Sequence, residues 1–441
     1  MTPGSAKSPQ PTPPPREGGA EGGGSGKQTT DSTTPSPPGR TFQALRHRNF
    51  RLWFYGQLTS LIGTWMQTIA QNWLVYQQLG GTARDLGMLN FIGALPLVPL
   101  TLFAGAIADR LSKRWIVFWM QAVMMVLAFI LGALSWTGVV TMWQVMALAL
   151  LLGAAQALDT PARQAFVVEL AGRDDLANAI SLNSGIFHGA RVIGPAMAGF
   201  LVAAVGIPIS FFINGASFLA VLASLLMMDA DQLHPIRAAS REEGRDLLAG
   251  LRYFRDHRVP LGLGLLITVS TLLAMPYHTL VPIFAKEVFA GNAGTYGSLM
   301  SASGIGAVCG ALFTASGRGV RRKGSQLFLG SMLFPFLLLL FAWSTVYWLS
   351  LTLLFGMGFC FVSQSAPANS ILQTMVPDHL RGRVLAIYVS LFLGFMRLGS
   401  LLLGLLADYS SPQAAMTTAG LLTLLLTTLV FARFPELRRV H

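Results

Sequence analysis

Residues 189–200 read GARVIGPAMAGF, and one arginine, Arg191, stands among small and apolar side chains. The stretch lies in a longer apolar run over 177–204, which as a helix is long enough to cross the roughly 30 Å hydrocarbon core of a bilayer. Exposing a charged side chain to lipid costs about 3 kcal/mol or more, so such a residue has to face a partner or a water-filled cavity. The stretch therefore predicts a membrane helix with one face turned towards a polar interior.

Apolar runs of this kind recur along the whole chain. Its 441 residues are 53% apolar and only 11% charged, against roughly 25% charged residues in a typical soluble domain. A segment that spans a bilayer and lacks the alternation of a porin strand satisfies its backbone polar groups as a helix. The sequence predicts an all-α integral membrane protein with twelve transmembrane helices, over 50–77, 87–108, 115–136, 139–162, 177–204, 208–228, 260–285, 294–316, 325–344, 347–371, 384–407 and 412–433.

The basic residues indicate the orientation of these helices. The formal net charge is +12, and 27 of the 31 Lys and Arg residues fall on one side of the membrane when the spans are threaded in order. Cytoplasmic loops carry the excess of Lys and Arg, so we expect both termini in the cytoplasm. This topology accounts for the basic charge, and no nucleic-acid partner is expected.

The segments outside the spans divide the chain into five parts. We expect a cytoplasmic tail over 1–41, a six-helix bundle over 42–229, a cytoplasmic linker over 230–259, a second bundle over 260–434 and a tail over 435–441. In the linker, Leu247, Leu248, Leu251 and Phe254 share one helical face, which favours a helix lying in the membrane interface.

Cofactor and metal sites are not indicated. The tail segment GSGKQTT lacks the first glycine and the final Ser or Thr of a phosphate-binding loop. The two cysteines, Cys309 and Cys360, fall inside apolar spans, where thiols are ordinary packing residues. We expect no cofactor and no metal.

The second arginine within a span, Arg397, is related to the first by an internal repeat. A shift of 206 residues aligns Pro161-Ala162 with Pro367-Ala368, Ser184 with Ser390 and Arg191 with Arg397. Both arginines lie near the bilayer midplane, where a guanidinium pair flanking a central cavity could bind carboxylate, phosphate or phenolate oxygens. The alternative is a packing role, in which carbonyl groups at helix ends satisfy each arginine.

Polar stripes on several spans favour the same interior. Spans one, four, seven and ten carry them, and lipid would disfavour such faces. The alternative for any single Gln or Ser is an interhelical hydrogen bond worth about 0.6 kcal/mol. The predicted cavity or substrate-binding residues are Gln67, Gln71, Asn72, Gln156, Asp159, His188, Arg191, His278, Gln364 and Arg397.

A second set of residues is predicted to act in conformational change. An acidic residue at a cytoplasmic helix end can pair with arginines and release them when the bundles rock. Pro195 loosens the helix ladder, and Gly194 permits close helix approach. The predicted gating residues are Gly105, Asp109, Arg110, Lys113, Arg114, Arg163, Gly194 and Pro195.

These motifs carry a resemblance to a known family. GAIADRLSKR (105–114) resembles the loop signature of the major facilitator superfamily, with Ser112 in place of its second glycine, and RVIGPAMAG (191–199) resembles the fifth-helix signature of its exporters. The longer segments RNFRLWFYGQLTSLIGTWMQTIAQNWLVYQ, LDTPARQAFVVEL and NAISLNSGIFHGARVIGPAMAGF resemble the subfamily of bacterial siderophore (enterobactin-type) and drug exporters.

The resemblance implies two six-helix bundles related by a twofold axis, a site between them and rocking-type alternating access. It also implies a monomer in the bacterial inner membrane that exports siderophores or drugs against protons, with a gating role for Asp109. Titratable candidates for coupling are Asp159, His188, His278 and Asp408. The chain has no charge over 143–156, where many proton-coupled relatives carry an arginine.

Two other functions stay open on the sequence. The same fold could serve uptake or lipid flipping, since direction is not encoded in periodicity. A membrane sensor or assembly factor would bind a ligand without moving it. An enzyme is not expected, because the sequence offers no nucleophile–base set and no cofactor loop.

Overall fold

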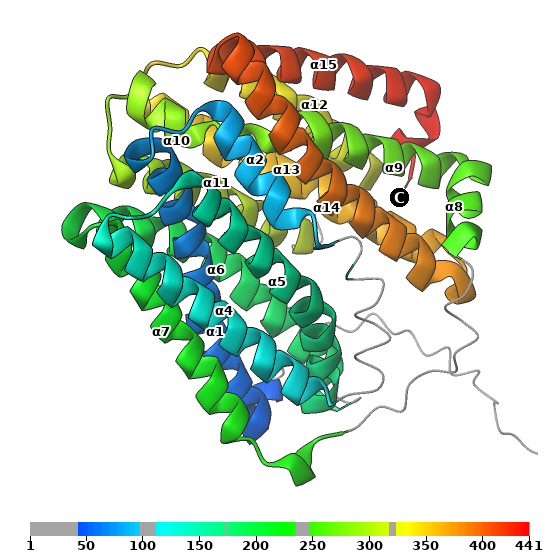
Figure 1. The fold of residues 1–441 in the computed structure, drawn as a ribbon. Helices are drawn as coiled ribbons and strands as arrows, with labels where there is room; N and C mark the ends of the chain where they lie inside the picture. Colours follow the sequence, from blue (N-terminus) through cyan, green and yellow to red (C-terminus); the bar gives the residue numbers. More distant parts are fainter. Residues whose placement is uncertain are drawn as a thin grey trace, which may run out of the picture. The chain divides into compact units, whose positions relative to one another are not determined.

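The fold is that of a computed structural model, which describes residues 43–97, 100, 112–172, 175–234, 247–316 and 323–440. Residues Thr41–His441 form one compact unit. Within the described residues the chain is helical and contains no strand (Figure 1). The α-helices are α1 (Arg48–Trp73), α2 (Ala83–Ala94), α4 (Lys113–Thr137), α5 (Met142–Ala171), α6 (Leu176–Val205), α7 (Ile207–Leu226), α8 (Leu247–Asp256), α9 (Arg258–Val269), α10 (Val281–Ile283), α11 (Ala293–Ala315), α12 (Lys323–Ala342), α13 (Tyr347–Met375), α14 (Asp378–Tyr409) and α15 (Pro412–Arg433).

Shorter turns of tighter or wider helix complete the described structure. The 3-10 turns are η1 (Gln43–Arg46), η3 (Ala230–Gln232), η5 (Met275–Thr279) and η8 (Pro435–Arg438), and the π turns are η2 (Leu74–Gln78), η4 (Ser270–Ala274) and η6 (Phe284–Val288). The predicted seventh span is therefore not one regular helix. It changes from α to π to 3-10 geometry around Pro276, because a proline removes one backbone donor from the ladder.

Ten helices in the described residues are long and apolar enough to cross a membrane, whereas the sequence predicts twelve. The two exceptions are the first two. The polar residues of α1, such as Gln57 and Gln67, lower its mean hydropathy, although its 26 residues exceed the length of a bilayer span. The described part of α2 is 12 residues long. The membrane-protein class of the fold is confirmed by the other ten.

The helix connections define two ends of the unit. One end, which we call the hairpin end, carries the short connections at 79–82, 138–141, 206, 289–292, 343–346 and 410–411. The opposite end, which we call the linker end, carries the starts of α4, α6, α9, α12 and α14. Large exposed aromatic rings gather at the helix termini of the hairpin end, as expected for a membrane interface: Trp136, Trp143, Trp343 and Trp348.

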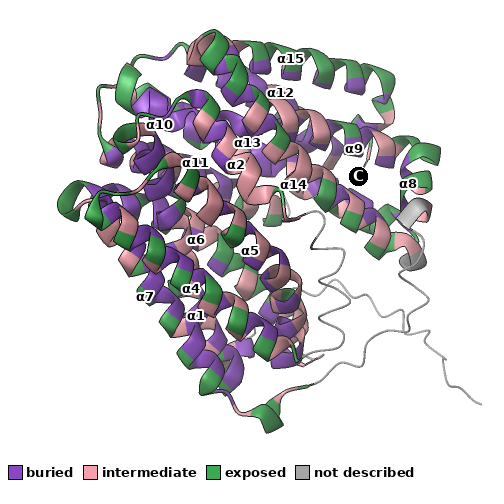
Figure 2. Cartoon of the chain, in the orientation of Figure 1, coloured by how far each residue is buried: buried purple, intermediate pink, exposed green. Residues whose placement is uncertain are grey.

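Exposed apolar side chains cover the faces of the helices that point away from their neighbours. On α15 the side chains of Leu421, Leu425 and Leu429 are exposed, and α4 exposes Trp119 and Val126. Figure 2 shows green outer stripes along α15 opposite purple faces that meet other helices. Apolar surface of this extent is typical of contact with lipid.

Two groups of helices pack among themselves and meet along two seams. In the first group α1 packs against α6 and α7, and α4 packs against α5 and α7. In the second group α13 packs against α11 and α12, and α12 packs against α15. The groups meet where α6 lies against α11 and where α2 lies against α14. Most of the contact between the first half of the chain and the second therefore runs along these two seams.

The linker helix α8 packs on protein. Phe254 is buried against the glycine at 264, and the side chain of Ile387 lies close to Gly250 on the α14 side. Leu251 remains 56% exposed. Phe254 therefore contributes to the protein core while Leu251 points outward, and the predicted position of this helix in the membrane interface stays a prediction.

Candidate functional site

The seam between α6 and α11 is built from backbone contacts at glycines. A Cβ atom on Gly297 would lie 2.5 Å from the carbonyl oxygen of Pro195 and 2.9 Å from the Cα of Gly199. A Cβ on Gly199 would in turn lie 3.0 Å from the carbonyl oxygen of Ala293. Small residues let the two backbones touch, as in other membrane helix pairs. The carbonyl oxygen of Pro195 thus lies at the seam, and the predicted hinge role of this residue stays a prediction.

The seam between α2 and α14 has the same construction. A Cβ on Gly404 would lie 2.5 Å from the carbonyl oxygen of Ala83 and 3.1 Å from the Cα of Gly87. A Cβ on Gly87 would meet the carbonyl oxygen of Ser400 at 2.5 Å. Ala83 and Gly87 correspond to Ala293 and Gly297 at an offset of 210 residues. Equivalent positions of the two repeats therefore form the two seams.

Both seams end part-way along their helices. Gly185 is seven residues before Val192, and Gly394 is seven residues before Leu401, so each lies on the same helix face as a seam residue, two turns nearer the linker end. Among the residues that the structure describes, a Cβ on either glycine would meet no atom of another segment within 4 Å. The faces that are closed by backbone contacts towards the hairpin end therefore have no described neighbour at these two positions towards the linker end.

Arg191 lies at the edge of the α6 seam. It is three residues before Gly194, whose Cβ position abuts Trp65 of α1, and four before Pro195, which faces α11. At about 100° per residue, the Arg191 side chain points between these two faces of α6, about 60° from the Gly194 face and about 40° from the Pro195 face. The guanidinium carbon stands 5.8 Å from the centre of the Trp65 ring. Within the described residues the guanidinium has no hydrogen bond and no ion pair.

Arg397 is placed differently. Its Nη1 donates to the Oδ1 of Asn90 on α2 at 3.4 Å, which joins the two helix groups. Arg397 is seven residues before Gly404 and so lies about 20° from the seam face, whereas Arg191 is eight before Gly199 and lies about 80° from it. A one-residue difference in register thus separates two arginines that the 206-residue repeat aligns.

Tyr277 and His278 belong to the second group. Their rings stack with centres 3.9 Å apart. The Tyr277 hydroxyl lies 2.8 Å from the Ser303 hydroxyl. His278 Nδ1 lies 2.9 Å from the carbonyl oxygen of Met275, so Nδ1 is the donor, and Nε2 is buried with no partner in the described residues.

Asp159 belongs to a buried network inside the first group. Its carboxylate accepts from Gln121 Nε2 at 3.1 Å and pairs with Arg163 Nε at 3.4 Å. Arg163 also donates to Gln57 Oε1 at 3.2 Å. The network joins α4, α5 and α1, and it places two predicted residues, one for the cavity and one for gating, in a single ion pair. Gln121 was not among the sequence-predicted residues.

Several of the predicted cavity residues hold neighbouring helices together. Gln67 Oε1 accepts from Asn214 Nδ2 of α7 at 2.6 Å, and Gln364 Nε2 donates to Ser270 Oγ at 2.6 Å. Asn72 Nδ2 donates to the Tyr296 hydroxyl at 3.3 Å and so connects α1 to α11. These contacts favour the interhelical alternative at those positions. Gln71 is buried, and Gln156 and His188 are half-buried.

The predicted gating residues divide into described and undescribed ones. Gly105, Asp109 and Arg110 lie outside the described residues. Lys113 Nζ lies 2.7 Å from Glu169 Oε1, which joins α4 to α5. Arg114 donates to the carbonyl oxygen of Leu226 at 3.4 Å.

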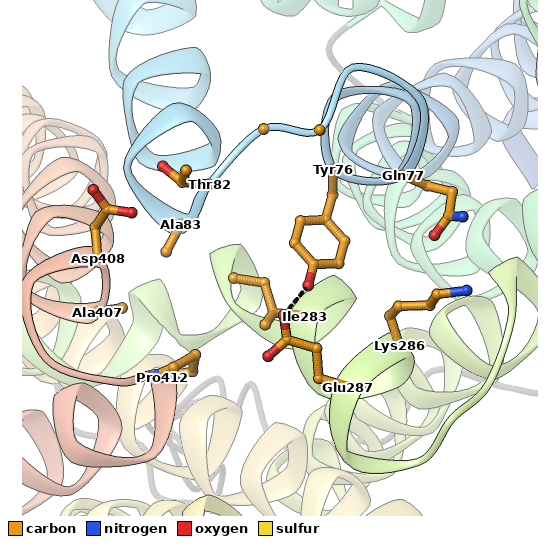
Figure 3. Close-up of a pocket in the computed structure, with 12 residues that line it drawn as sticks. Tyr76, Gln77, Thr82, Ala83, Ile283, Lys286, Glu287, Ala407, Asp408 and Pro412 are labelled. Atoms are coloured by element: carbon orange, nitrogen blue, oxygen red, sulfur yellow. Dashed lines mark hydrogen bonds between the residues drawn. The ribbon is translucent and has the colours of Figure 1, made fainter.

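A further contact between the helix groups lies at the hairpin end, in a cavity of about 480 Å³ (Figure 3). There the Tyr76 hydroxyl donates to the Glu287 carboxylate. At the 210-residue offset Tyr76 corresponds to Lys286 and Gln77 to Glu287, so Gln77 and Lys286 occupy the symmetry-related positions. Both line the cavity, as does Asp408. Sequence reasoning did not select this pair, although the repeat of a Gly-rich turn after both segments is a usable signal.

Comparison with known proteins places this architecture in a family. The family of transmembrane secretion effectors matches residues 39–440. The chain is 27% identical over 404 residues to the staphyloferrin A transporter of Staphylococcus aureus, covering 86% of this chain and 95% of the relative. It is 29% identical over 405 residues to the multidrug efflux pump Tap of Mycolicibacterium fortuitum, covering 88% and 95%.

A solved structure supports the fold. The nucleoside transporter NupG superposes with a TM-score of 0.67 at 15% sequence identity, covering 88% of this chain and 99% of the other. Together with the membrane helices and the two glycine seams, the family match identifies the class of protein. The chain belongs to the transmembrane secretion effector family of the major facilitator superfamily, and it is a multi-pass membrane transporter, not an enzyme.

Proposed function

We propose that this transporter exports amphipathic small molecules of the siderophore or drug type by alternating access. In this proposal residues 42–229 and 260–434 form two bundles that rock about the seams, with the linker 230–259 between them. The hairpin end faces outward, and both termini lie in the cytoplasm, in line with the distribution of Lys and Arg. The protein works as a monomer in the bacterial inner membrane.

One observation carries the proposal most directly. The faces of α6 and α14 that are sealed by glycine contacts near Gly199 and Gly404 have no neighbour within 4 Å of a Cβ at Gly185 or Gly394 in the described part of the chain. A carrier closed on one side and open on the other has this arrangement, and rocking would exchange the two states. The open side is the linker end, where a substrate for export would enter from the cytoplasm.

Proton countertransport is the finer part of the proposal. Among the titratable candidates, Asp408 lines the hairpin-end cavity, where an exported molecule would leave. Asp159 is paired with Arg163, His188 lies one helical turn before Arg191 on α6, and the His278 ring stacks on Tyr277. Exchange of protons at such groups would draw on the existing gradient, which fits a chain without a nucleotide-binding motif.

The test is flux in proteoliposomes that contain the purified full-length protein. Ethidium and iron-free staphyloferrin A serve as probes, and a proton gradient of either sign is imposed. We expect movement of a probe out of the compartment that faces the linker end, accelerated when protons flow the opposite way. No flux of any probe under any proton or sodium gradient would refute export.

The alternatives predict other results in the same vesicles. Net movement in the opposite direction would select uptake, and redistribution of a labelled lipid without probe flux would select lipid flipping. A probe that binds and never crosses would select a sensor or assembly factor. A matched control is Gly297→Leu, which leaves all titratable residues in place but obstructs the α6–α11 seam.

A further inference from the structure

The two arginines of the membrane helices have different surroundings, and this difference bears on the substrate. Arg397 already has a partner in Asn90 across the α2–α14 seam. Arg191 has none in the described residues, and its guanidinium packs over the ring of Trp65. An arginine this deep in a membrane protein has to be compensated by a ligand, water or a polar group.

The position over Trp65 leaves the donor groups of Arg191 available. A guanidinium that packs over an aromatic ring uses its face, while its five N–H donors point outward in the plane. Those donors form a rigid fork that matches the two oxygens of a carboxylate. The aromatic surface holds the fork in place before a ligand arrives, so less side-chain freedom is lost on binding.

The helix register places the Arg191 side chain next to the proposed route. The side chain leaves α6 between the α1 face and the α11 face, and its helix stripe continues towards the linker end through His188 and Ser184. His188 is half-buried and Ser184 is exposed, so accessibility increases along this stripe. A molecule that enters from the linker end would meet His188 first and Arg191 at the point where the seam closes.

We propose that Arg191, and not its repeat partner Arg397, anchors the anionic group of the transported molecule, with Trp65 as the aromatic wall of this subsite. The ligand class is an organic anion in which a carboxylate or similar planar oxyanion is joined to an aromatic or apolar body. Arg397 instead holds α14 to α2. This inference rests on the proposed function and specifies its substrate.

The experiment compares two fluorescent probes that differ in charge alone: dansylglycine, a carboxylate, and dansylglycinamide, its neutral analogue. Binding to the full-length protein in nanodiscs is measured by fluorescence titration. We expect the wild type to prefer the carboxylate by about tenfold or more, as one charge-assisted hydrogen-bonded pair provides. Arg191→Gln should remove this preference while binding of dansylglycinamide stays within about twofold, and that retained binding reports a folded protein.

Arg397→Gln is the matched control and should keep the preference, because its guanidinium contacts Asn90 and not the ligand. An Arg191→Gln protein that still prefers the carboxylate overturns the proposal. So does a wild type that binds the carboxylate no better than the amide, or that binds neither. Trp65→Leu should weaken both probes without changing their ratio.

A measurement on the wild type covers the case in which Arg191→Gln does not fold. Phenylglyoxal modifies accessible arginines, and mass spectrometry of the digested protein reports the modification at each position. We expect dansylglycine, but not dansylglycinamide, to protect Arg191 and leave Arg397 unaffected. Equal modification of Arg191 with and without the carboxylate overturns the anchor, as does an Arg191 that is never modified.

Failure of the anchor and failure of export give different patterns. Ethidium flux without any carboxylate preference would refute the role of Arg191 and leave the export proposal standing. A carboxylate preference that depends on Arg191, in vesicles without flux, would support the role of Arg191 and refute export.

Discussion

The Cα of Gly199 lies so close to Gly297 that a single added carbon on Gly297 would stand 2.9 Å from it. The contact closes one seam between the two helix groups, and the Gly404–Gly87 contact closes the other. Neither contact uses a long side chain. The halves therefore meet at the hairpin end through backbone surfaces, which makes the seams sensitive to the smallest possible substitution.

Gly297→Ala should open the α6–α11 seam, because its Cβ would also stand 2.5 Å from the Pro195 carbonyl oxygen and the backbone has to move. We expect a lower melting temperature in detergent and reduced flux. Gly185→Ala is the control, since its Cβ meets no described atom of another segment within 4 Å and alanine favours a helix by about 1 kcal/mol. Equal stability of the two variants would contradict this description of the seam.

Tyr76→Phe should favour the state that is open at the hairpin end. The hydrogen bond to Glu287 joins the two groups there, and a bond of this kind is worth about 1 kcal/mol, or roughly a fivefold change in the equilibrium. Spin labels on the two helix groups at that end would report the population by their distance distribution.

A double-mutant cycle with Glu287→Gln isolates the pair. The double variant should be no more open than Tyr76→Phe alone, because the interaction can be lost only once. Gln77→Ala is the control on the neighbouring position of the same cavity. Additive effects of the two substitutions would mean that the hydrogen bond does not act between the groups.

Asp159→Asn should destabilise the protein strongly. Removing the charge of one partner of a buried ion pair costs about 3 kcal/mol or more, since Arg163 would keep its charge with only the neutral oxygens of Asn at position 159 and of Gln57 beside it. Thermal unfolding in detergent measures the loss. Gln164→Ala, at an exposed position on the same helix, should have little effect.

A double substitution of Asp159 and Arg163 also separates a structural role of Asp159 from a role in proton coupling. Asp159→Leu combined with Arg163→Leu should recover part of the stability lost by Asp159→Asn, because no unpaired charge remains. If Asp159 carries the coupled proton, flux in the double variant will stay uncoupled from the gradient even where the fold is recovered. Full proton-driven flux in that variant would exclude it as the coupling residue.

Lys113→Gln should lower stability more than Arg114→Gln does. Lys113 forms an ion pair with Glu169, which is 9% exposed, whereas Arg114 makes one long contact to a backbone carbonyl. Melting temperatures of the two variants test the difference. If Arg114→Gln lowered the melting temperature more than Lys113→Gln, the prediction would be wrong. Unchanged stability together with lost flux in Lys113→Gln would support a gating role for Lys113.

Most helix positions follow from hydropathy alone, and the departures have local causes. The predicted span 294–316 agrees with α11 to within one residue at each end. The predicted span 139–162 stops too early, because α5 continues through Pro161 to Ala171. Those extra turns bury Phe166 and Glu169 against neighbouring helices, so packing, not lipid, stabilises them.

The site is less accessible to sequence reasoning because it depends on rotation about helix axes. The repeat aligns Arg191 with Arg397, but a shift of one residue turns a side chain by about 100°. That turn decides whether the guanidinium meets Asn90 across a seam or Trp65 beside it. Likewise, the sequence alone predicts Gln67 and Gln364 as cavity residues. Only the structure shows that they form hydrogen bonds with Asn214 and Ser270 on neighbouring helical segments.

The paired π turns η2 and η6 have an evolutionary consequence. Tyr76 and Lys286 descend from one ancestral position, and Gln77 and Glu287 from another, if the repeat arose by duplication. In the ancestral protein the contact between the first of these positions in one repeat and the second in the other repeat would have formed twice, once on either side of the twofold axis. After duplication one side was free to become a hydrogen-bonded Tyr–Glu pair while the other became Gln and Lys, so selection could tune the strength of closure without disturbing the scaffold that both copies share.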